Sequence, residues 1–333
     1  MTLNKLAQLA HTSVSTVSKA FSGKGDISDA TREHIFAVAR EHGCFQQFYH
    51  VPYDRPVVAV IIPEVIGKTY LRYLEALRRS LEENGYTMLL SISNFDPQMQ
   101  EELIRYYFEH GKVDGLVLVD GSALGDGLST APENTRTALV RIGRSKPLDV
   151  CVHSGLRDAI ADCLADLHSL GHRNVAYVGE PLTEQKRRML SEEMEKLGIS
   201  VCREHMICSL KRFEEAGRDG VRKLLDSSLP FPTVIFGGYG TITAAILDEL
   251  TAHGIRVPED VSLISLNKDG LSESAHVQIA HLSCKIEDEC KEVIRLLKER
   301  IGKEHPNEPC SIKIPTCLYP GNTIKPPRQK EEL

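Results

Sequence analysis

The sequence predicts an α/β fold in which a small helical domain precedes a core of two doubly wound parallel-sheet subdomains. Residues 3–42 carry apolar side chains at helical spacing in three segments. From residue 57 onward, continuous apolar strands alternate with amphipathic helices, which is typical of parallel sheets covered on both faces. The alternation runs in two series that join near residue 150, so we expect two subdomains with a cleft between them.

Residues 3–21 predict two short helices joined by a tight turn. Apolar residues from Leu3 to Ala10 recur at helical spacing. Ser13 stands just before the second helix, with Thr16 three residues further on, so we expect Ser13 to cap that helix. The spacing turns residues 17, 20 and 21 inward and leaves residues 14, 15, 18 and 19 facing outward. Such an exposed helix N-terminus fits a DNA major groove, although an ordinary helical hairpin capped by Ser and Thr gives the same pattern.

The order of residues here resembles the headpiece of the lactose/galactose repressor (LacI/GalR) family. The resemblance implies a sequence-specific, homodimeric transcription regulator that binds a double-stranded DNA operator, most simply as a repressor. Lys19 stands where the family usually has Arg, and His11 where it has Gly, a position at which positive φ would strain His. The matching positions are Ala7, Ala10, Ser13, Thr16, Val17, Ser18, Ser28, Thr31 and Arg32. The implied DNA-binding residues are Val14, Ser15 and Lys19 toward the bases, Thr2, Ser13, Ser18, Ser28 and Thr31 mainly toward phosphates, and Thr16.

A linker is expected at residues 44–56, after a headpiece at residues 1–43. The resembled family has a proline-asparagine pair and a short hinge helix here, and this sequence has neither. Pro52 and Pro56 also restrict helix formation. The aromatic residues of the linker either pack on a domain, which we favour, or wedge into a base step. These residues are Phe45, Phe48, Tyr49 and Tyr53.

The core is expected at residues 57–323, followed by a tail at 324–333. Predicted strands are 57–63, 87–93, 115–120, 137–142, 174–179, 205–209, 233–236, 261–266 and 311–318, and predicted helices are 69–84, 98–109, 158–170, 184–197, 213–225, 241–254 and 286–301. The stretches 84–86, 113–116, 170–173, 232–236 and 257–262 resemble the periplasmic-binding-protein-like core of the same family, which implies three chain crossings between subdomains. The first subdomain is expected at about 57–149 and 283–308, and the second at about 150–282 and 309–323.

The expected ligand cleft departs from the resembled family. Ligands of such sheets bind beyond the carboxyl ends of the strands. Where sugar-sensing members have carboxylates and asparagines, this chain has Tyr239-Gly240, Asn267-Lys268 and Gly155-Leu156. Without those carboxylates sugar hydroxyls lose their acceptors, while lysines bring positive charge to the rim. We therefore expect an anionic effector, or else solvated lysines around a pocket that has drifted or closed. The candidate cleft residues are Lys68, Tyr70, Asp120, Ser122, Lys186, Tyr239, Asn267 and Lys268.

Composition excludes several other classes of function. The chain has 333 residues and a net charge of −6, and residues 1–50 hold five Lys/Arg against four Asp/Glu, so phosphate contacts must come largely from hydroxyls and backbone N–H groups. Nine cysteines without metal-ligand spacing indicate reduced thiols in a cytoplasmic protein with no cofactor or metal. No apolar run approaches the roughly 20 residues of a membrane span, and no signal peptide begins the chain. Thirteen histidines form no catalytic arrangement, so we expect no enzyme.

The dimer surface is expected on the core. Helix 69–84 could supply part of it through Leu71, Tyr73, Leu74 and Leu77, although core packing explains the same residues equally well. Two alternative functions remain open. One is a small-molecule binding module of the same fold without regulatory DNA binding, and the other is a regulator controlled by a protein partner.

Overall fold

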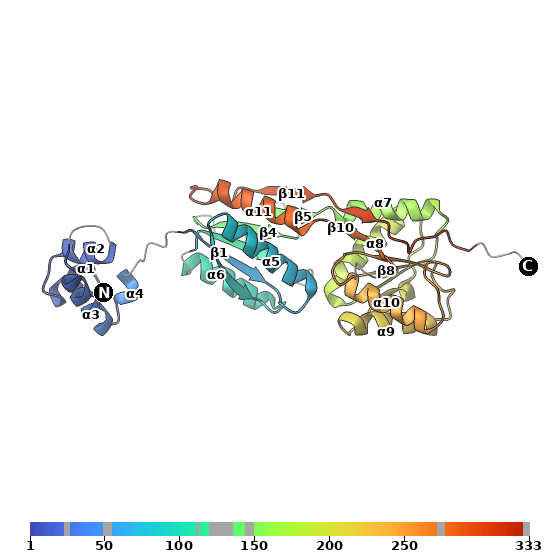
Figure 1. Ribbon diagram of the computed structural model, residues 1–333, viewed down its shortest axis with the longest axis horizontal. Coiled ribbons are helices and arrows are strands. Elements are labelled where there is room, and N and C mark those ends of the chain that lie inside the picture. Colours follow the sequence, from blue (N-terminus) through green and yellow to red (C-terminus); the bar gives the residue numbers. More distant parts are fainter. Residues whose placement is uncertain are drawn as a thin grey trace, which may run out of the picture. The chain divides into compact units, whose positions relative to one another are not determined.

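A computed structural model describes residues 1–22, 27–48, 55–110, 113–119, 136–143, 150–271 and 277–328 (Figure 1). Two compact units divide the chain, Met1–Arg55 and Pro56–Leu333. Several predictions fall outside the described residues, namely those on Asp120, Ser122, Tyr49, Pro52 and Tyr53. Within the described part, no helix is both long and apolar enough to span a bilayer.

The first unit is a bundle of short helices around one apolar cluster. Its helices are α1 (Leu3–Leu9), α2 (Val14–Ser22), α3 (Asp29–Glu41) and α4 (Phe45–Phe48). Val17, Ala20 and Phe21 of α2 are buried against the inner faces of α1 and α3, as the helical spacing predicted. The turn between α1 and α2 places His11 at φ 50°, so the strain expected of a non-glycine residue at this position is present.

The aromatic residues that follow α3 pack on the headpiece. The ring of Phe21 lies 5.9 Å from that of Phe45 and 5.7 Å from that of Phe48. The Arg40 guanidinium lies 4.5 Å from the centre of the Phe45 ring. Packing on the domain, the interpretation favoured from sequence, is therefore confirmed for Phe45 and Phe48. Their short helix α4 was not predicted.

The second unit begins with a six-stranded parallel sheet in the order β11-β5-β4-β3-β1-β2. Its apolar strands are covered by α5 and α11 on one face and by α6 on the other. The strands are β1 (Val57–Ile62), β2 (Thr87–Ile92), β3 (Gly115–Val119), β4 (Ala138–Ile142), β5 (Val150–Ser154) and β11 (Cys310–Ile314). The helices are α5 (Lys68–Glu83), α6 (Pro97–Glu109) and α11 (Ile286–Arg300).

A second six-stranded sheet has the order β12-β10-β9-β8-β6-β7, and only β12 runs antiparallel to its neighbour. Helices α7 and α8 cover one face, and α9 and α10 cover the other. The strands are β6 (Val175–Gly179), β7 (Met206–Cys208), β8 (Val234–Gly237), β9 (Ser262–Ser265), β10 (Ala280–Ser283) and β12 (Cys317–Tyr319). The helices are α7 (Leu156–Ser169), α8 (Glu184–Lys196), α9 (Phe213–Asp226) and α10 (Gly240–Ala252), with 3-10 turns at Pro181–Thr183 and Arg203–His205.

The chain crosses between the two sheets three times, as the family resemblance implied. The predicted subdomain boundaries were wrong by one strand at two crossings, because β5 and β11 pair with each other in the first sheet. The predicted strand 311–318 is in fact two strands, one in each sheet. Strands β5 and β10 were missed. The expected tail also packs on the second subdomain as far as Arg328, which pairs with Asp260 at 2.8 Å.

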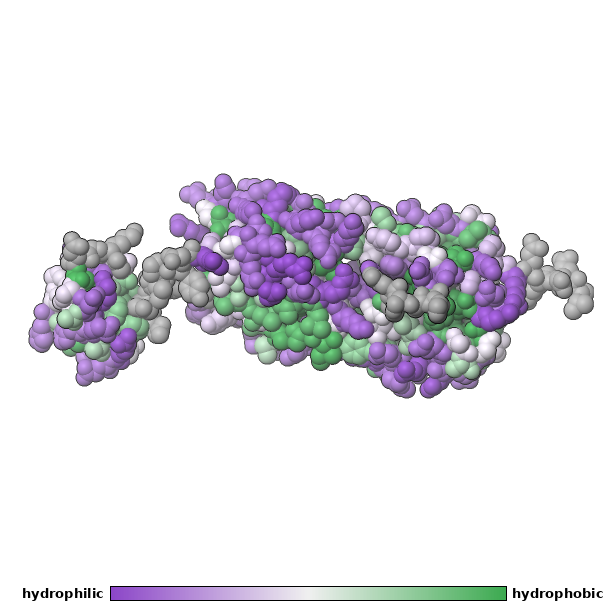
Figure 2. Space-filling model, in the orientation of Figure 1, coloured by the Kyte–Doolittle hydropathy of each residue, from purple (hydrophilic) through white to green (hydrophobic). Residues whose placement is uncertain are grey.

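An apolar surface area lies on the first subdomain (Figure 2). It gathers around β2, which is the edge strand of its sheet, and around the neighbouring helix α6. The exposed side chains are Leu89, Leu90, Ile92, Met99 and Tyr106, with Leu71 of α5 also exposed. In contrast, Leu77 is fully buried and Tyr73 and Leu74 pack against the core. Of the four α5 residues considered for a dimer surface, only Leu71 therefore remains available.

Candidate functional site

The outward side of α2 is the candidate DNA-binding surface. Val14, Ser15, Ser18 and Lys19 are exposed, whereas the opposite side of the same helix is buried. The buried side fixes the helix on the bundle, so the exposed side is presented as one rigid surface. Such a surface offers one cationic donor, two hydroxyls and one apolar contact.

Hydroxyl side chains hold the N-termini of all three main helices of the headpiece. The Thr2 Oγ1 atom accepts the backbone N–H of Lys5 at 3.3 Å. The Ser13 Oγ atom accepts the backbone N–H of Thr16 at 3.0 Å, and Ser28 Oγ accepts that of Thr31 at 3.1 Å. These caps satisfy orphan donors at the helix starts, so the same residues shape the surface that the sequence assigned to phosphates.

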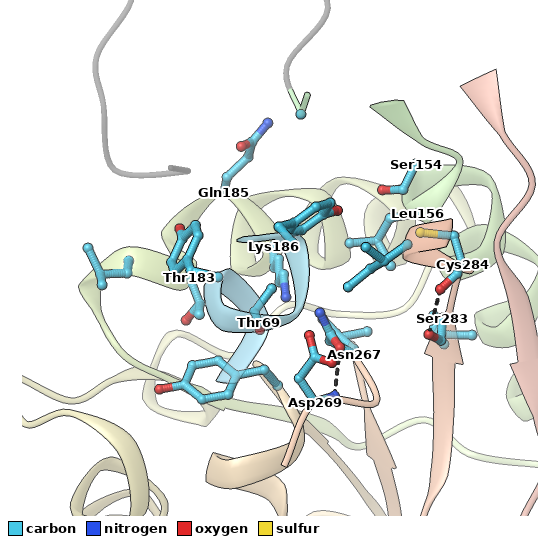
Figure 3. A pocket seen from close by; sticks show the side chains of 18 of the residues that line it. Thr69, Ser154, Leu156, Thr183, Gln185, Lys186, Asn267, Asp269, Ser283 and Cys284 are labelled. Atoms are coloured by element: carbon cyan, nitrogen blue, oxygen red, sulfur yellow. Dashed lines mark hydrogen bonds between the residues drawn. The ribbon is translucent and has the colours of Figure 1, made fainter. Parts of the chain in front are cut away.

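A cavity of about 710 Å³ lies between the two subdomains of the core (Figure 3). Residues at the carboxyl ends of strands of both sheets line it, as the rule for doubly wound sheets requires. Among the predicted cleft residues, Lys68, Tyr70, Lys186, Tyr239 and Asn267 line the cavity. Lys268 does not, because the chain turns there and presents Asp269 instead.

The cavity lacks carboxylates at residues 155–156, 239–240 and 267, but it has others. Four carboxylates line the described part of the cavity, and they come from positions that the family pattern does not use: Glu64, Asp158, Glu180 and Asp269. Glu64 and Glu180 follow β1 and β6 directly, so a survey of strand ends would have found them. Each of the four has a cationic neighbour, and the pairs are Glu64 and Glu180 with Arg212, Asp158 with Lys313, and Asp269 with Arg72.

Lys186 lines the cavity and has no ion-pair partner among the described residues. It extends from α8, and its Nζ atom donates to the Gly238 carbonyl oxygen at 2.9 Å. Burial lowers the pKa of this ammonium to about 8, while the charges of Asp269, Cys284 and Glu180 oppose that shift. An ammonium has three donors, so Lys186 keeps two for a ligand. Its neighbours Arg187 and Arg188 pair with Glu184 instead.

A buried carboxyl lies behind the cavity wall. Glu289 of α11 is 1% exposed, and its Oε2 atom accepts the hydroxyl of Tyr73, a residue that lines the cavity. Burial raises the pKa of Glu289 to about 7, although hydrogen bonds from Tyr73 and Cys284 act in the opposite direction. No sequence pattern pointed to this residue.

Comparisons with known proteins agree with both halves of this description. Residues 2–45 match the model for bacterial regulatory proteins of the lacI family, and residues 164–324 match a periplasmic binding protein-like domain. The transcriptional regulator DegA of Bacillus subtilis is 26% identical over 286 residues, which cover 82% of this chain and 83% of DegA. The transcriptional repressor CytR of Escherichia coli K12 is 23% identical over 317 residues, 91% of each chain.

A solved structure shows the same fold over nearly the whole chain. It is a LacI-family transcriptional regulator from Silicibacter pomeroyi, with a TM-score of 0.70 and 20% identity, and the match covers 98% of this chain and 99% of that one. Fold and headpiece together define a helix-turn-helix DNA-binding transcription regulator rather than an enzyme. The chain thus combines a LacI-family helix-turn-helix domain with a periplasmic-binding-protein-like domain, and the relatives it resembles over most of its length are transcriptional regulators.

Glu289 makes the stability of the core depend on pH. Its folded pKa of about 7 lies above the ordinary value of 4.5, so its contribution is complete below pH 4.5 and is lost as pH rises through 7. Glu289→Gln keeps an oxygen acceptor for Tyr73 but cannot ionise. We expect the free energy of unfolding of the natural protein to fall by up to about 3 kcal/mol relative to that of the variant over this window.

Urea unfolding at a series of pH values between 4.5 and 8 measures this difference. Histidines and surface carboxylates titrate in both proteins, so the comparison isolates Glu289. Parallel stability curves for the two proteins would show that Glu289 ionises normally in the folded state.

Proposed function

We propose that this protein is a homodimeric repressor that binds a near-palindromic operator and senses a small effector carrying an anionic group. The observation that supports DNA reading is the division of α2 into a buried side and an exposed side that ends in Lys19. The observation that supports an anionic effector is the cationic group of Lys186 in a cavity whose carboxylates already have partners.

Reading of DNA would depend on few charges. Lys19 donates from a single ammonium, which can reach a guanine edge but lacks the bidentate fork of Arg. Phosphates would be held mainly by hydroxyls and backbone N–H groups at the helix starts, where the helix dipoles also favour anions. Because one headpiece makes few such contacts, two headpieces on two half-sites would supply the affinity.

A second copy of the chain would cover the apolar area around β2. Edge strands with exposed apolar residues are prone to pair with other chains, and natural proteins usually protect them. Here Leu89, Leu90 and Ile92 remain exposed on such a strand, beside Met99 and Tyr106 of α6. Burial of this area in a symmetric dimer would remove it from water and place two headpieces in one assembly.

An anionic effector would complete the charge balance of the cavity. Arg72, Arg212 and Lys313 pair with the four carboxylates of the lining, and because Arg212 serves both Glu64 and Glu180, one negative charge remains to set against the lysines. Arg157 pairs with Glu192 and Glu193 at 2.7 and 2.8 Å. Lys68 and Lys186 have no ion-pair partner among the described residues. A phosphate or carboxylate group of a ligand would supply the missing negative charge near Lys186.

Lys19→Ala tests the DNA-binding surface. If Lys19 contacts a base, the variant should lose about 1–3 kcal/mol of discrimination at one base pair of the operator. Electrophoretic mobility shift with the promoter of the protein's own gene and its single-base variants measures this loss. Lys5→Ala removes the same charge from an exposed position on α1, and this control variant should leave the base preference unchanged. An equal loss on every operator variant would instead identify Lys19 as a phosphate contact.

Lys186→Met tests the effector proposal. Calorimetry with inorganic phosphate, a hexose phosphate, a sugar acid and the neutral hexose should show heat with the anions at pH 7 and none in the variant. Because the pKa of Lys186 is about 8, affinity for the anions should decline as pH rises through 8. Lys196→Met, on the same helix but paired with Glu193 outside the cavity, is the matched control. Binding of the neutral hexose alone would contradict the anionic assignment.

Leu90→Glu tests the dimer surface. A charge on this edge strand should shift the monomer–dimer equilibrium toward monomer by at least about tenfold, because a carboxylate would be buried without a partner. Sedimentation velocity over a range of protein concentrations measures the shift. Leu170→Glu places the same charge on an equally exposed leucine at the end of α7 and should leave the dimer intact. Unchanged sedimentation of the Leu90 variant would move the interface elsewhere.

A further inference from the structure

Arg212 joins the two subdomains at the wall of the cavity. It precedes α9 in the second subdomain, and Glu64 follows β1 in the first. The Arg212 Nη1 and Nη2 atoms donate to the two carboxylate oxygens of Glu64 at 3.1 and 2.9 Å. This bidentate pairing is the strongest geometry available to an arginine and a carboxylate, and it fixes both side chains in orientation.

The guanidinium is also enclosed by aromatic rings from both subdomains. It lies 4.5 Å from the centre of the Phe213 ring and 5.7 Å from that of Phe95, which follows β2 in the first subdomain. Its Nε atom lies 3.7 Å from Glu180, whose side chain is 2% exposed. Glu180 in turn accepts the backbone N–H of Phe213 and the hydroxyl of Tyr239. The Arg212 guanidinium is therefore surrounded by two carboxylates and two aromatic rings rather than held by a single contact.

The backbone on both sides of this contact is strained. Among the described non-glycine residues, four have positive φ, and three of these lie here: Asn94 at 52°, Phe95 at 57° and Phe213 at 54°. Such conformations cost free energy, and they persist where surrounding contacts hold them. A second ion pair, between Arg72 of α5 and the 1% exposed Asp269 of the second subdomain, joins the same two subdomains deeper in the cavity.

We propose that Arg212 is a latch by which the protein's own side chains hold the two subdomains together beside the cavity. The proposal builds on the regulatory role proposed for the cleft: the closed arrangement would be the resting arrangement, and an effector would act by shifting the protein away from it or by stabilising it further. The latch consists of Arg212, Glu64, Phe95 and Phe213. Opening of the latch would break the contacts of Arg212, in the second subdomain, with Glu64 and Phe95, in the first, in a single step.

Hydrogen–deuterium exchange on the full-length protein without DNA tests the latch, because each substitution can be read out in the opposite subdomain. Glu64→Gln, in the first subdomain, should raise the exchange rate of the Phe213 amide in the second about tenfold. Arg212→Met, in the second subdomain, should raise the exchange rate of the Asp96 amide in the first by a similar factor. Because both substitutions break the same contact, the double variant should exchange no faster than either single variant.

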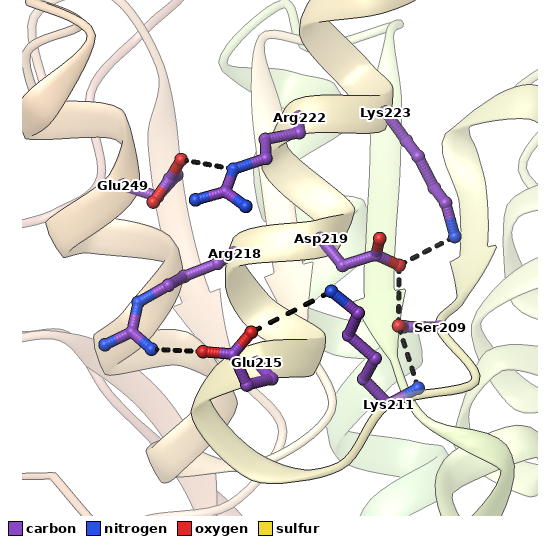
Figure 4. A network of polar contacts seen from close by, with 8 residues as sticks. All are labelled: Ser209, Lys211, Glu215, Arg218, Asp219, Arg222, Lys223 and Glu249. Atoms are coloured by element: carbon purple, nitrogen blue, oxygen red, sulfur yellow. Dashed lines mark hydrogen bonds and ion pairs between the residues drawn. The ribbon is translucent and has the colours of Figure 1, made fainter.

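Arg222→Met is the matched control. Arg222 lies on α9 as well and pairs with Glu249 at 2.9 Å, but both residues belong to the second subdomain (Figure 4). This variant should leave the Asp96 amide unchanged. Arg212→Lys keeps the charge without the bidentate fork, so its exchange rates should fall between those of the natural protein and Arg212→Met, and it provides a readout should Arg212→Met unfold.

Changes confined to the substituted subdomain, or single effects that multiply in the double variant, would overturn the latch. Neither DNA nor a ligand enters this experiment. A negative result therefore leaves the operator and effector proposals standing. Failure of those two proposals would in turn not change the exchange rates expected at the Phe213 and Asp96 amides.

Discussion

The arrangement of the core depends on the pairing of charges at the carboxyl ends of two parallel sheets. The strand ends of both sheets face one cavity, and four carboxylates project there from the described residues. A carboxylate removed from water needs a cation and hydrogen bonds, or it costs several kcal/mol. Arg72 and Arg212 meet this need from the subdomain opposite to their partners. The requirement to neutralise buried charge thus also sets how the subdomains meet.

The same pairing decides which groups are left for a ligand. Carboxylates that accept from guanidinium groups have fewer lone pairs to offer a ligand hydroxyl. Lys186 differs because its ammonium makes one hydrogen bond to a backbone carbonyl and has a pKa that burial has lowered. A cation in this condition gains most from a ligand anion, since the anion would offset the cost of burial.

Local patterns predicted the regular elements well and the long-range contacts poorly. The buried side of α2 follows from spacing within a few residues, and the positive φ of His11 follows from the family resemblance, which has Gly at that position. Strands β5 and β10 were missed because they are short and contain His and Ser residues, and only their neighbours in the sheet make them strands. Arg212 escaped notice because its partner Glu64 is 148 residues away and β7 before it has three residues. The family pattern predicts cleft residues only at the positions that the family uses. This chain has its cleft carboxylates at other positions, such as Glu64 and Glu180, so the pattern did not reveal them.

The headpiece is coupled to the chain that follows it through one buried ring. Phe21 lies on the inner side of α2, and its ring contacts Phe36 of α3 as well as Phe45 and Phe48 of α4. Helix α4 is the last described element of the first unit, and it packs on the cluster around Phe21. The outer side of the same helix carries Lys19. Helix α2 therefore presents Lys19 on its exposed side, while its buried side provides the ring on which α4 packs.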